Sequence, residues 1–234
     1  MNKLLKKMMV ALLSLGLAQA VWADDVSDFQ ETLQAAEQGN AQAQFNLGWM
    51  YANGQGVRQD DAQAAQWFRK AAEQGVATAQ FGLGVMYYEG EGVRQDDAQA
   101  VQWYRRAAEQ GYADAQNNLG LMYANGHGVR QDYAQAVQWY RRAAEQGKAE
   151  AQNNLGEMYY KGEGVRQDYK QAVQWFRNAA EQGVDEAQFY LGIMYYKGHG
   201  VRQDLALAQE WLGKACQNGY QKGCDNYQRL KAGY

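Results

Sequence analysis

The chain has 234 residues, a formal net charge of −3 and no proline. This mildly acidic balance argues against binding to nucleic acid or to an anionic membrane surface. Because proline breaks helices and punctuates loops, its absence favours a chain that is helical almost throughout.

Residues 1–23 have the features of a signal peptide. Three lysines precede an apolar run over residues 8–20, which is short for a membrane-spanning helix. Small residues permit cleavage after Ala20 or after Ala23, and we expect Ala23 because an acidic pair follows it. The alternative is an uncleaved anchor. We therefore expect an exported protein, periplasmic or secreted, with no membrane insertion after the signal is removed.

A period of 36 residues organises the rest of the chain. The motif Val-Arg-Gln-Asp recurs at the same place in each period, at 57–60, 93–96, 129–132, 165–168 and 201–204. It defines five repeats, numbered 1 to 5 in chain order, over 40–75, 76–111, 112–147, 148–183 and 184–219. Residues 24–39 look like a lone second helix, an N-terminal half-repeat. Residues 220–234 look like a degraded first helix that caps the array.

Each repeat is predicted to hold two helices. In repeat 1 the first helix lies near residues 41–53, and its apolar face carries Leu47, Met50 and Tyr51. Gly48 allows a neighbouring helix to approach, and Gly54 suits a left-handed helix end. One such hairpin cannot bury its apolar face alone, whereas stacked copies can.

The second helix of each repeat is expected to begin at an aspartate cap. In repeat 1 this is Asp60, with Gln63 completing a capping box. Repeat 5 loses the box, because Leu207 replaces the glutamine there. Large aromatic residues alternate with alanines along the second helix, as interlocking helices require.

These motifs resemble the Sel-one-like repeat (SLR) family, a relative of the tetratricopeptide repeat. The residues of repeat 1 that carry the resemblance are Ala43, Leu47, Gly48, Tyr51, Gly54, Gly56, Val57, Asp60, Ala64, Trp67, Phe68, Ala71, Ala72 and Gly75. They recur in the other four repeats, except that Tyr or Leu replaces Phe68 in repeats 2, 3 and 5 and Cys216 replaces Ala72 in repeat 5. The resemblance covers nearly all of the chain after the signal peptide. It implies an all-α fold, a right-handed α-α superhelix or solenoid, that binds proteins or peptides.

The two cysteines, Cys216 and Cys224, are predicted to form a disulfide in an oxidising compartment. Their Cys-x7-Cys spacing is similar to that of bacterial cysteine-rich SLR proteins. The bridge would join the last helix to repeat 5.

Side chains for catalysis or metal binding are scarce. Ser27 is the one serine after the signal peptide, and no Ser-x-x-Lys motif surrounds it. His127 and His199 occupy a turn position that holds Gln or Glu in other repeats, so we expect solvated side chains too distant to share a metal ion. We expect no enzyme activity, no catalytic residues, no cofactor and no metal site.

Variable positions on the first helices indicate where a partner binds. By resemblance, the corresponding tetratricopeptide positions line a concave groove, and the predicted groove residues are Phe45, Trp49, Phe81, Val85, Tyr88, Asn117, Leu121, Asn153, Glu157, Tyr160, Phe189, Ile193 and Tyr196. Rings would supply contact area, and amides would bond a peptide backbone. Asp114, Glu150 and Glu186 edge this stripe and would favour basic segments. The alternative is that some of these rings pack between repeats.

The leading hypothesis is an exported scaffold, expected to be monomeric, that grips a protein or peptide in this groove. A β-lactam-binding or peptidoglycan-binding or hydrolysing protein is the alternative, motivated by the cysteine-rich resemblance alone. A purely architectural role in the envelope or in adhesion is a third hypothesis.

Overall fold

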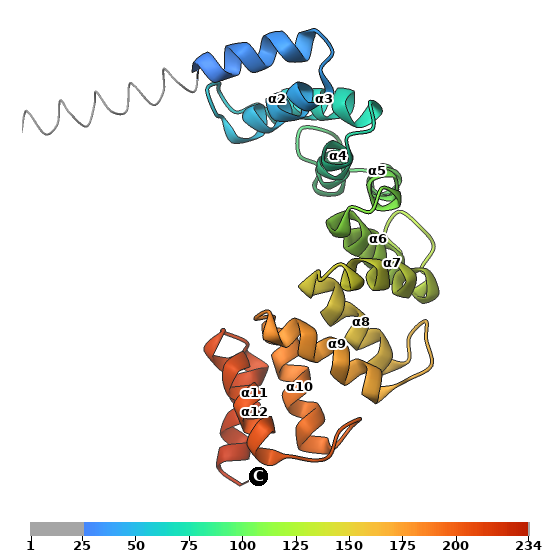
Figure 1. Ribbon diagram of the computed structural model, residues 1–234, viewed down its shortest axis with the longest axis vertical. Helices are drawn as coiled ribbons and strands as arrows, with labels where there is room; N and C mark the ends of the chain where they lie inside the picture. Colours follow the sequence, from blue (N-terminus) through green and yellow to red (C-terminus); the bar gives the residue numbers. More distant parts are fainter. Residues whose placement is uncertain (1–25, 234) are drawn as a thin grey trace, which may run out of the picture. The chain divides into compact units, whose positions relative to one another are not determined.

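The computed structural model describes residues 26–233, and this range is helical, without a strand. The first helix covers residues 26–37. The helices that follow it are α2 (Ala41–Asn53), α3 (Asp61–Glu73), α4 (Ala77–Glu89), α5 (Asp97–Glu109), α6 (Ala113–Asn125), α7 (Tyr133–Glu145), α8 (Ala149–Lys161), α9 (Tyr169–Glu181), α10 (Asp185–Lys197), α11 (Leu205–Gln217) and α12 (Gln221–Lys231) (Figure 1). The predicted signal peptide and both predicted cleavage points lie outside the described residues, as do Asp24, Asp25 and Tyr234.

The chain forms two compact units, divided between Ala107 and Ala108 near the end of α5. In unit 1, α2 packs on α3 and α3 packs on α4. In unit 2, each helix from α6 to α11 packs on the helix that follows it, and the series ends at α12. Helix pairs stacked in chain order confirm the predicted all-α solenoid of helix–turn–helix repeats.

A leucine at the centre of each first helix forms the core of each repeat. Leu47 and Leu83 in unit 1 are fully buried, and so are Leu119, Leu155 and Leu191 in unit 2. Full burial of such a side chain is worth about 2 kcal/mol relative to exposure. The predicted apolar face is therefore the face that packs inside the repeats.

The glycine that follows this leucine makes room for an aromatic ring from the second helix. A Cβ built on Gly48 would lie 2.7 Å from the Phe68 ring, and one on Gly156 would lie 2.8 Å from the Phe176 ring. Such distances are shorter than van der Waals contact, so a side chain here would push the two helices apart. The predicted close helix approach is confirmed.

The turn between the helices also joins one repeat to the next. Gly54 ends α2 with a left-handed φ of 68°, as predicted, and its amide donates to the Met50 carbonyl. In repeat 2, a Cβ on Gly92 would meet the Asp61 carbonyl oxygen of repeat 1 at 2.0 Å. Gly164 lies in the same way against Tyr133 in unit 2. Each of these turns rests on the start of the preceding second helix.

The aspartate caps are present, but the predicted capping box is wrong. The Asp60 carboxylate accepts from the Gln63 amide at 3.0 Å. The Asp60 amide, which the Gln63 side chain would have to satisfy in a capping box, donates instead to the Tyr51 carbonyl at 3.0 Å. The glutamine side chain is therefore not needed, and in repeat 5 Asp204 still caps the Leu207 amide at 3.0 Å.

Within residues 26–233, none of the helices combines the length and apolar character that crossing a membrane requires.

Candidate partner-binding surface

The predicted groove residues occupy equivalent positions on α2, α4, α6, α8 and α10, and we call them the first-helix surface. Their exposure differs. Trp49, Tyr88, Leu121 and Tyr196 are exposed, with 48%, 36%, 37% and 37% of their surface open to solvent. Seven members are half-buried, namely Phe45, Phe81, Val85, Glu157, Tyr160, Phe189 and Ile193. Asn117 and Asn153 are buried.

Exposed apolar bulk gathers on this surface. Among the described residues, the other large apolar side chains that are similarly exposed are Val26 and Leu205, and both lie off the first helices of the repeats. Scattered exposed apolar residues need no explanation, but a recurring position does. The exposed members of the first-helix surface recur at two positions of the repeat, which is typical of a binding face.

In unit 1, two of the predicted groove rings pack within their own repeats. The Phe45 ring lies 5.7 Å from that of Phe68, and the Phe81 ring lies 5.8 Å from that of Tyr104. Such tilted contacts add to the stability of the core. Trp49 and Tyr88 are thus the members of unit 1 that offer most area to a partner.

A hollow of about 480 Å³ opens beside Trp49 in unit 1. It lies between the helix over residues 26–37 and α2, and Asp28, Glu31 and Thr32 line it together with Phe45 and Trp49. The N-terminal helix thus supplies polar groups along one edge of an aromatic surface.

In unit 2, aromatic rings from three helices form a cluster at the junction of repeats 4 and 5. Tyr190 stacks on Phe176 at 4.9 Å, and Tyr160 lies 5.7 Å from Tyr190. Burial, with smaller contributions from the carboxylates of Glu157 and Glu186, raises the pKa of Tyr190 to about 12. This cluster supports the alternative in which some rings pack between repeats.

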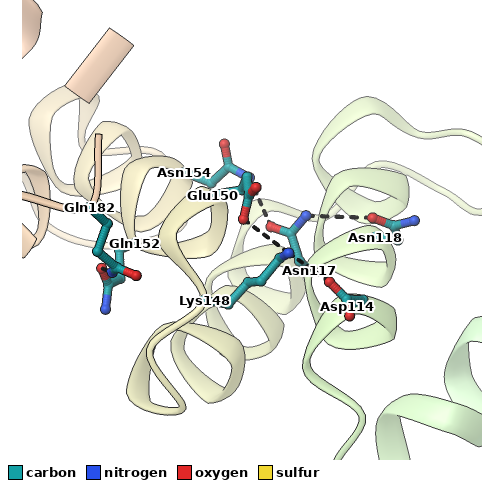
Figure 2. Close-up of polar contacts among 8 residues, drawn as sticks. All are labelled: Asp114, Asn117, Asn118, Lys148, Glu150, Gln152, Asn154 and Gln182. Carbon is teal, nitrogen blue, oxygen red and sulfur yellow. Dashed lines mark hydrogen bonds and ion pairs between the residues drawn. The ribbon is translucent and has the colours of Figure 1, made fainter. Parts of the chain in front are cut away.

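The two asparagines are not available to a peptide backbone, contrary to the prediction. Asn117 accepts a hydrogen bond from Asn154 at 3.0 Å, as Figure 2 shows. The Asn153 amide donates to Glu186 at 3.0 Å. Both asparagines are about 95% buried, with relative exposures of 6% and 5%. They join neighbouring repeats, and the buried Oδ1 of Asn153 has no hydrogen-bond partner among the described residues.

The acidic edge makes contacts within the protein but remains partly exposed. Lys148 lies 2.7 Å from Asp114 and 3.1 Å from Glu150 (Figure 2). Hydrogen bonding to Asp114 is the largest of the effects that raise the pKa of Lys148, so the lysine stays charged and offsets one of these two negative charges. Glu186 is bonded by Asn153. The expected preference of this edge for basic segments stays a prediction, because the three carboxylates keep a net negative charge.

A buried glutamine, which sequence reasoning did not single out, links each repeat to the one before it. The Gln152 side chain donates to the Ala144 carbonyl at 3.1 Å, and its oxygen accepts from Gln182 at 2.8 Å. Figure 2 shows Gln152 beside Gln182. The equivalent glutamines, all buried, are Gln44, Gln80, Gln116 and Gln188. Their identity in all five repeats was the available signal.

At the C-terminal end, Cys216 and Cys224 form the predicted disulfide, with their Cα atoms 4.4 Å apart. Cys224 stands at the position of the buried glutamine, and Cys216 stands at the position whose carbonyl that glutamine bonds. A covalent bond thus joins the two positions that a hydrogen bond joins in the repeats.

The sequence model of the Sel1 repeat family matches this chain five times, over residues 41–76, 77–112, 113–148, 149–184 and 185–220. The chain belongs to the Sel1 repeat family. The matches cover well over half of its length and begin one residue later than the repeats defined above.

Two solved structures show the same Sel1 repeat architecture. A protective antigen of uropathogenic Escherichia coli with an SLR fold is 45% identical, with a TM-score of 0.81 over 83% of this chain. This chain spans 42% of the length of that antigen. A Sel1 repeat protein from Oxalobacter formigenes is 37% identical, with a TM-score of 0.81 over 94% of this chain and 87% of its own. A comparison with curated proteins found no significant match.

The histidines of this Sel1 repeat protein lie in turns, and they differ in their surroundings. His127 is exposed. His199 is half-buried and stacks on Tyr169 at 4.6 Å, so it is a packing residue and not the solvated loop tip that was expected. Over residues 26–233, no three His, Cys, Asp or Glu side chains are grouped so that they could hold a metal ion.

Proposed function

We propose that this Sel1 repeat protein is an exported, monomeric scaffold that binds a protein or peptide through its first-helix surface. Sel1 repeat proteins are generally non-enzymatic scaffolds for protein interactions. The observation that carries the proposal is the gathering of exposed apolar side chains on the first helices: Trp49 and Tyr88 in unit 1, and Leu121 and Tyr196 in unit 2. Exposed aromatic residues of this kind supply a large share of binding energy at interfaces.

Export is supported by two further features. Disulfides such as that between Cys216 and Cys224 persist in oxidising compartments and are rare in the cytosol. The sequence also starts with lysines followed by a short apolar run, the pattern of a secretory signal. The protein therefore belongs, in this proposal, to the periplasm or the extracellular medium, where its ligand is another protein or a peptide.

The test compares double variants in each unit with a matched control. Trp49→Ala with Tyr88→Ala removes the exposed rings of unit 1, and Leu121→Ala with Tyr196→Ala does the same in unit 2. Leu205→Ala is the control, because Leu205 is 51% exposed on α11, away from the first helices. Circular dichroism melting should show all three variants folded, since these side chains are exposed.

Partners would be identified by crosslinking in the native cell and mass spectrometry, and then measured with purified components. At least one double variant should weaken binding by roughly 30-fold or more, which is the loss of one interface hot spot, while Leu205→Ala should bind like the wild type. Equal binding by both double variants and the control would rule out the first-helix surface.

A further inference from the structure

The centre of the second helix holds an aromatic ring in repeats 1 to 4 but not in repeat 5. The residues at this position are Phe68, Tyr104, Tyr140, Phe176 and Leu212. At the junction of repeats 4 and 5, the ring of Phe176 lies between two others. It stacks on Tyr190 at 4.9 Å and lies 6.5 Å from Tyr160. Three rings therefore occupy this junction.

The equivalent junction between repeat 5 and α12 keeps only one of the three rings. Tyr196 corresponds to Tyr160, but Leu212 replaces Phe176 and Asn226 replaces Tyr190. A hollow of about 570 Å³ lies here, lined by Ile193, Tyr196, Leu212, Asn226, Arg229 and Leu230. We call it the terminal hollow. The smaller side chains leave space at the position that rings occupy one repeat earlier.

The lining of the terminal hollow combines apolar groups with a single cation. Leu212 is buried, and Ile193 and Leu230 are half-buried, so apolar surface forms much of the wall. Arg229 is exposed, and within residues 26–233 its side chain makes no hydrogen bond or ion pair. A guanidinium group beside an apolar hollow favours a carboxylate, which it can bind with two parallel hydrogen bonds.

The terminal hollow is continuous with the first-helix surface, because Ile193 and Tyr196 belong to both. A partner segment lying on the first helices of unit 2 would therefore reach it. The carboxylates elsewhere on this part of the surface do not compete for Arg229, since Glu157 is held by Lys161 at 2.5 Å and Glu186 by Asn153 at 3.0 Å.

We propose that the terminal hollow binds a large apolar side chain, aromatic or leucine, from an extended segment of a partner protein, and that Arg229 binds the carboxylate of an acidic residue next to it. This inference rests on the proposed function and adds a sequence preference to it. At the terminal hollow the preferred segment is apolar and acidic.

The test fills the hollow with a ring that the protein already uses at this position. Leu212→Phe introduces the residue found in repeats 1 and 4, where the preceding helix accommodates it through Gly48 and Gly156. Asn226→Tyr introduces a ring from α12, at the position that Tyr190 occupies one repeat earlier. It is the second filling variant, to be used if Leu212→Phe disturbs folding. Arg229→Gln removes the charge and keeps the hollow open.

The probes are fluorescent hexapeptides with a central Phe followed by Glu, Gln or Lys, and a matched peptide with Ala in place of Phe. The wild type should bind the Phe-Glu peptide about tenfold more tightly than the Ala-Glu peptide, as burial of an aromatic side chain predicts. Either filling variant should lose this tenfold difference. Arg229→Gln should keep the preference for Phe and lose the preference for Glu over Gln.

Several outcomes would overturn the proposal. If the filling variants bind the Phe-Glu peptide as the wild type does, while Leu121→Ala weakens binding, the first-helix surface stands and the terminal hollow is not the site. If no peptide binds, or if neither kind of variant changes binding, the terminal hollow is not the site, whereas the proposed function fails only if the double variants of the first-helix surface also bind the partner like the wild type. A preference for Lys over Glu also contradicts the inference. So does a dimer in sedimentation that Leu212→Phe dissociates, because the occupant would then be a second copy of the chain.

Discussion

Two junctions in unit 2, between repeats 4 and 5 and between repeat 5 and α12, have equivalent positions in contact but are stabilised by different interactions. Between repeats 4 and 5, the Gln188 side chain donates to the Ala180 carbonyl at 3.1 Å, and three rings occupy the space between the helices. Between repeat 5 and α12, a disulfide stands in place of that hydrogen bond, and a hollow stands in place of two rings.

The two junctions also differ in the packing of their helices among the described residues. Helix α10 packs on α9 and on α11, whereas α12 packs mainly on α11. A helix with one packed neighbour gains less buried area and frays more easily than one with two. The disulfide adds a covalent constraint to the close contacts that α12 makes with α11, such as that of the Tyr227 ring with Gly213.

The largest expected effect comes from removing the central ring of the inner junction. Phe176 is fully buried, so Phe176→Ala should destabilise the fold by about 3–5 kcal/mol. Leu212→Ala, the matched change beside the terminal hollow, should cost less, because the removed side chain is smaller and borders open space. Hydrogen exchange of the amides in α8 to α11 measures both. A larger loss for Leu212→Ala would contradict the comparison.

Breaking the disulfide should have the next largest effect. Closing a loop of about nine residues stabilises by about 2.5 kcal/mol in the chain-entropy model. Reduction should therefore lower the hydrogen-exchange protection of α12 and leave that of α8 unchanged.

A second variant replaces the disulfide with the residues of the inner junction. Cys216→Ala with Cys224→Gln restores the residues that the inner junction uses, and it should recover about 1 kcal/mol relative to Cys216→Ala with Cys224→Ala. Unchanged protection of α12 in the reduced protein would show that packing alone holds the terminal junction.

Loss of the buried glutamine should cost somewhat less. Gln188→Leu leaves the Ala180 carbonyl and the Asn218 side chain without their partner, which should cost about 1–3 kcal/mol. Gln203→Ala is the matched control. Its side chain also bonds a backbone carbonyl, that of Tyr196, but it is exposed, so its loss should cost at most about 1 kcal/mol. Urea denaturation of both variants measures the difference.

The smallest effect is a pH dependence at the inner junction. The pKa of Tyr190 is raised from 10.0 to about 12, so as the pH rises past 10 the unfolded chain loses this proton first. Stability should therefore fall between about pH 10 and pH 12, because the unfolded state binds fewer protons there. Burial also raises the pKa of Tyr140, so absorbance at alkaline pH should show more than one late-ionising tyrosine. Tyr190→Phe should remove the step near pH 12 and leave any later step in place, and persistence of the step near pH 12 would assign it to another residue.

Sequence reasoning predicted the features of this fold that each repeat contains within itself. The helices, the aspartate caps and the left-handed Gly54 depend on residues a few positions apart, so their patterns are visible in the sequence. The capping box failed because the amide of Asp60 had a second acceptor nine residues back, the Tyr51 carbonyl. The sequence pattern of a helix start covers only a few residues, so it cannot include an acceptor nine residues earlier.

The candidate site was predicted less completely, because it depends on contacts between repeats. Asn117 and Asn153 lie at variable positions of a helix face, which suggested ligand contact. Their partners, Asn154 and Glu186, stand in the following repeats. The terminal hollow depends on side-chain volume from three helices at once, and the periodicity of a single helix contains no such information. The exposure of Trp49 and Tyr88 agrees with their place on the predicted face, whereas Phe45 and Phe81 on the same face are half-buried.

The turn glycine has a consequence for how arrays of this kind change in length. Gly92 and Gly164 both lie against the start of the second helix one repeat earlier, and the buried glutamines bond a carbonyl eight residues back in the same way each time. A block of 36 residues therefore begins and ends with matching surfaces. Duplication or deletion of a whole block requires no new kind of contact, whereas an insertion of one residue in the turn would misplace the glycine. Such genes are free to grow or shrink by entire repeats.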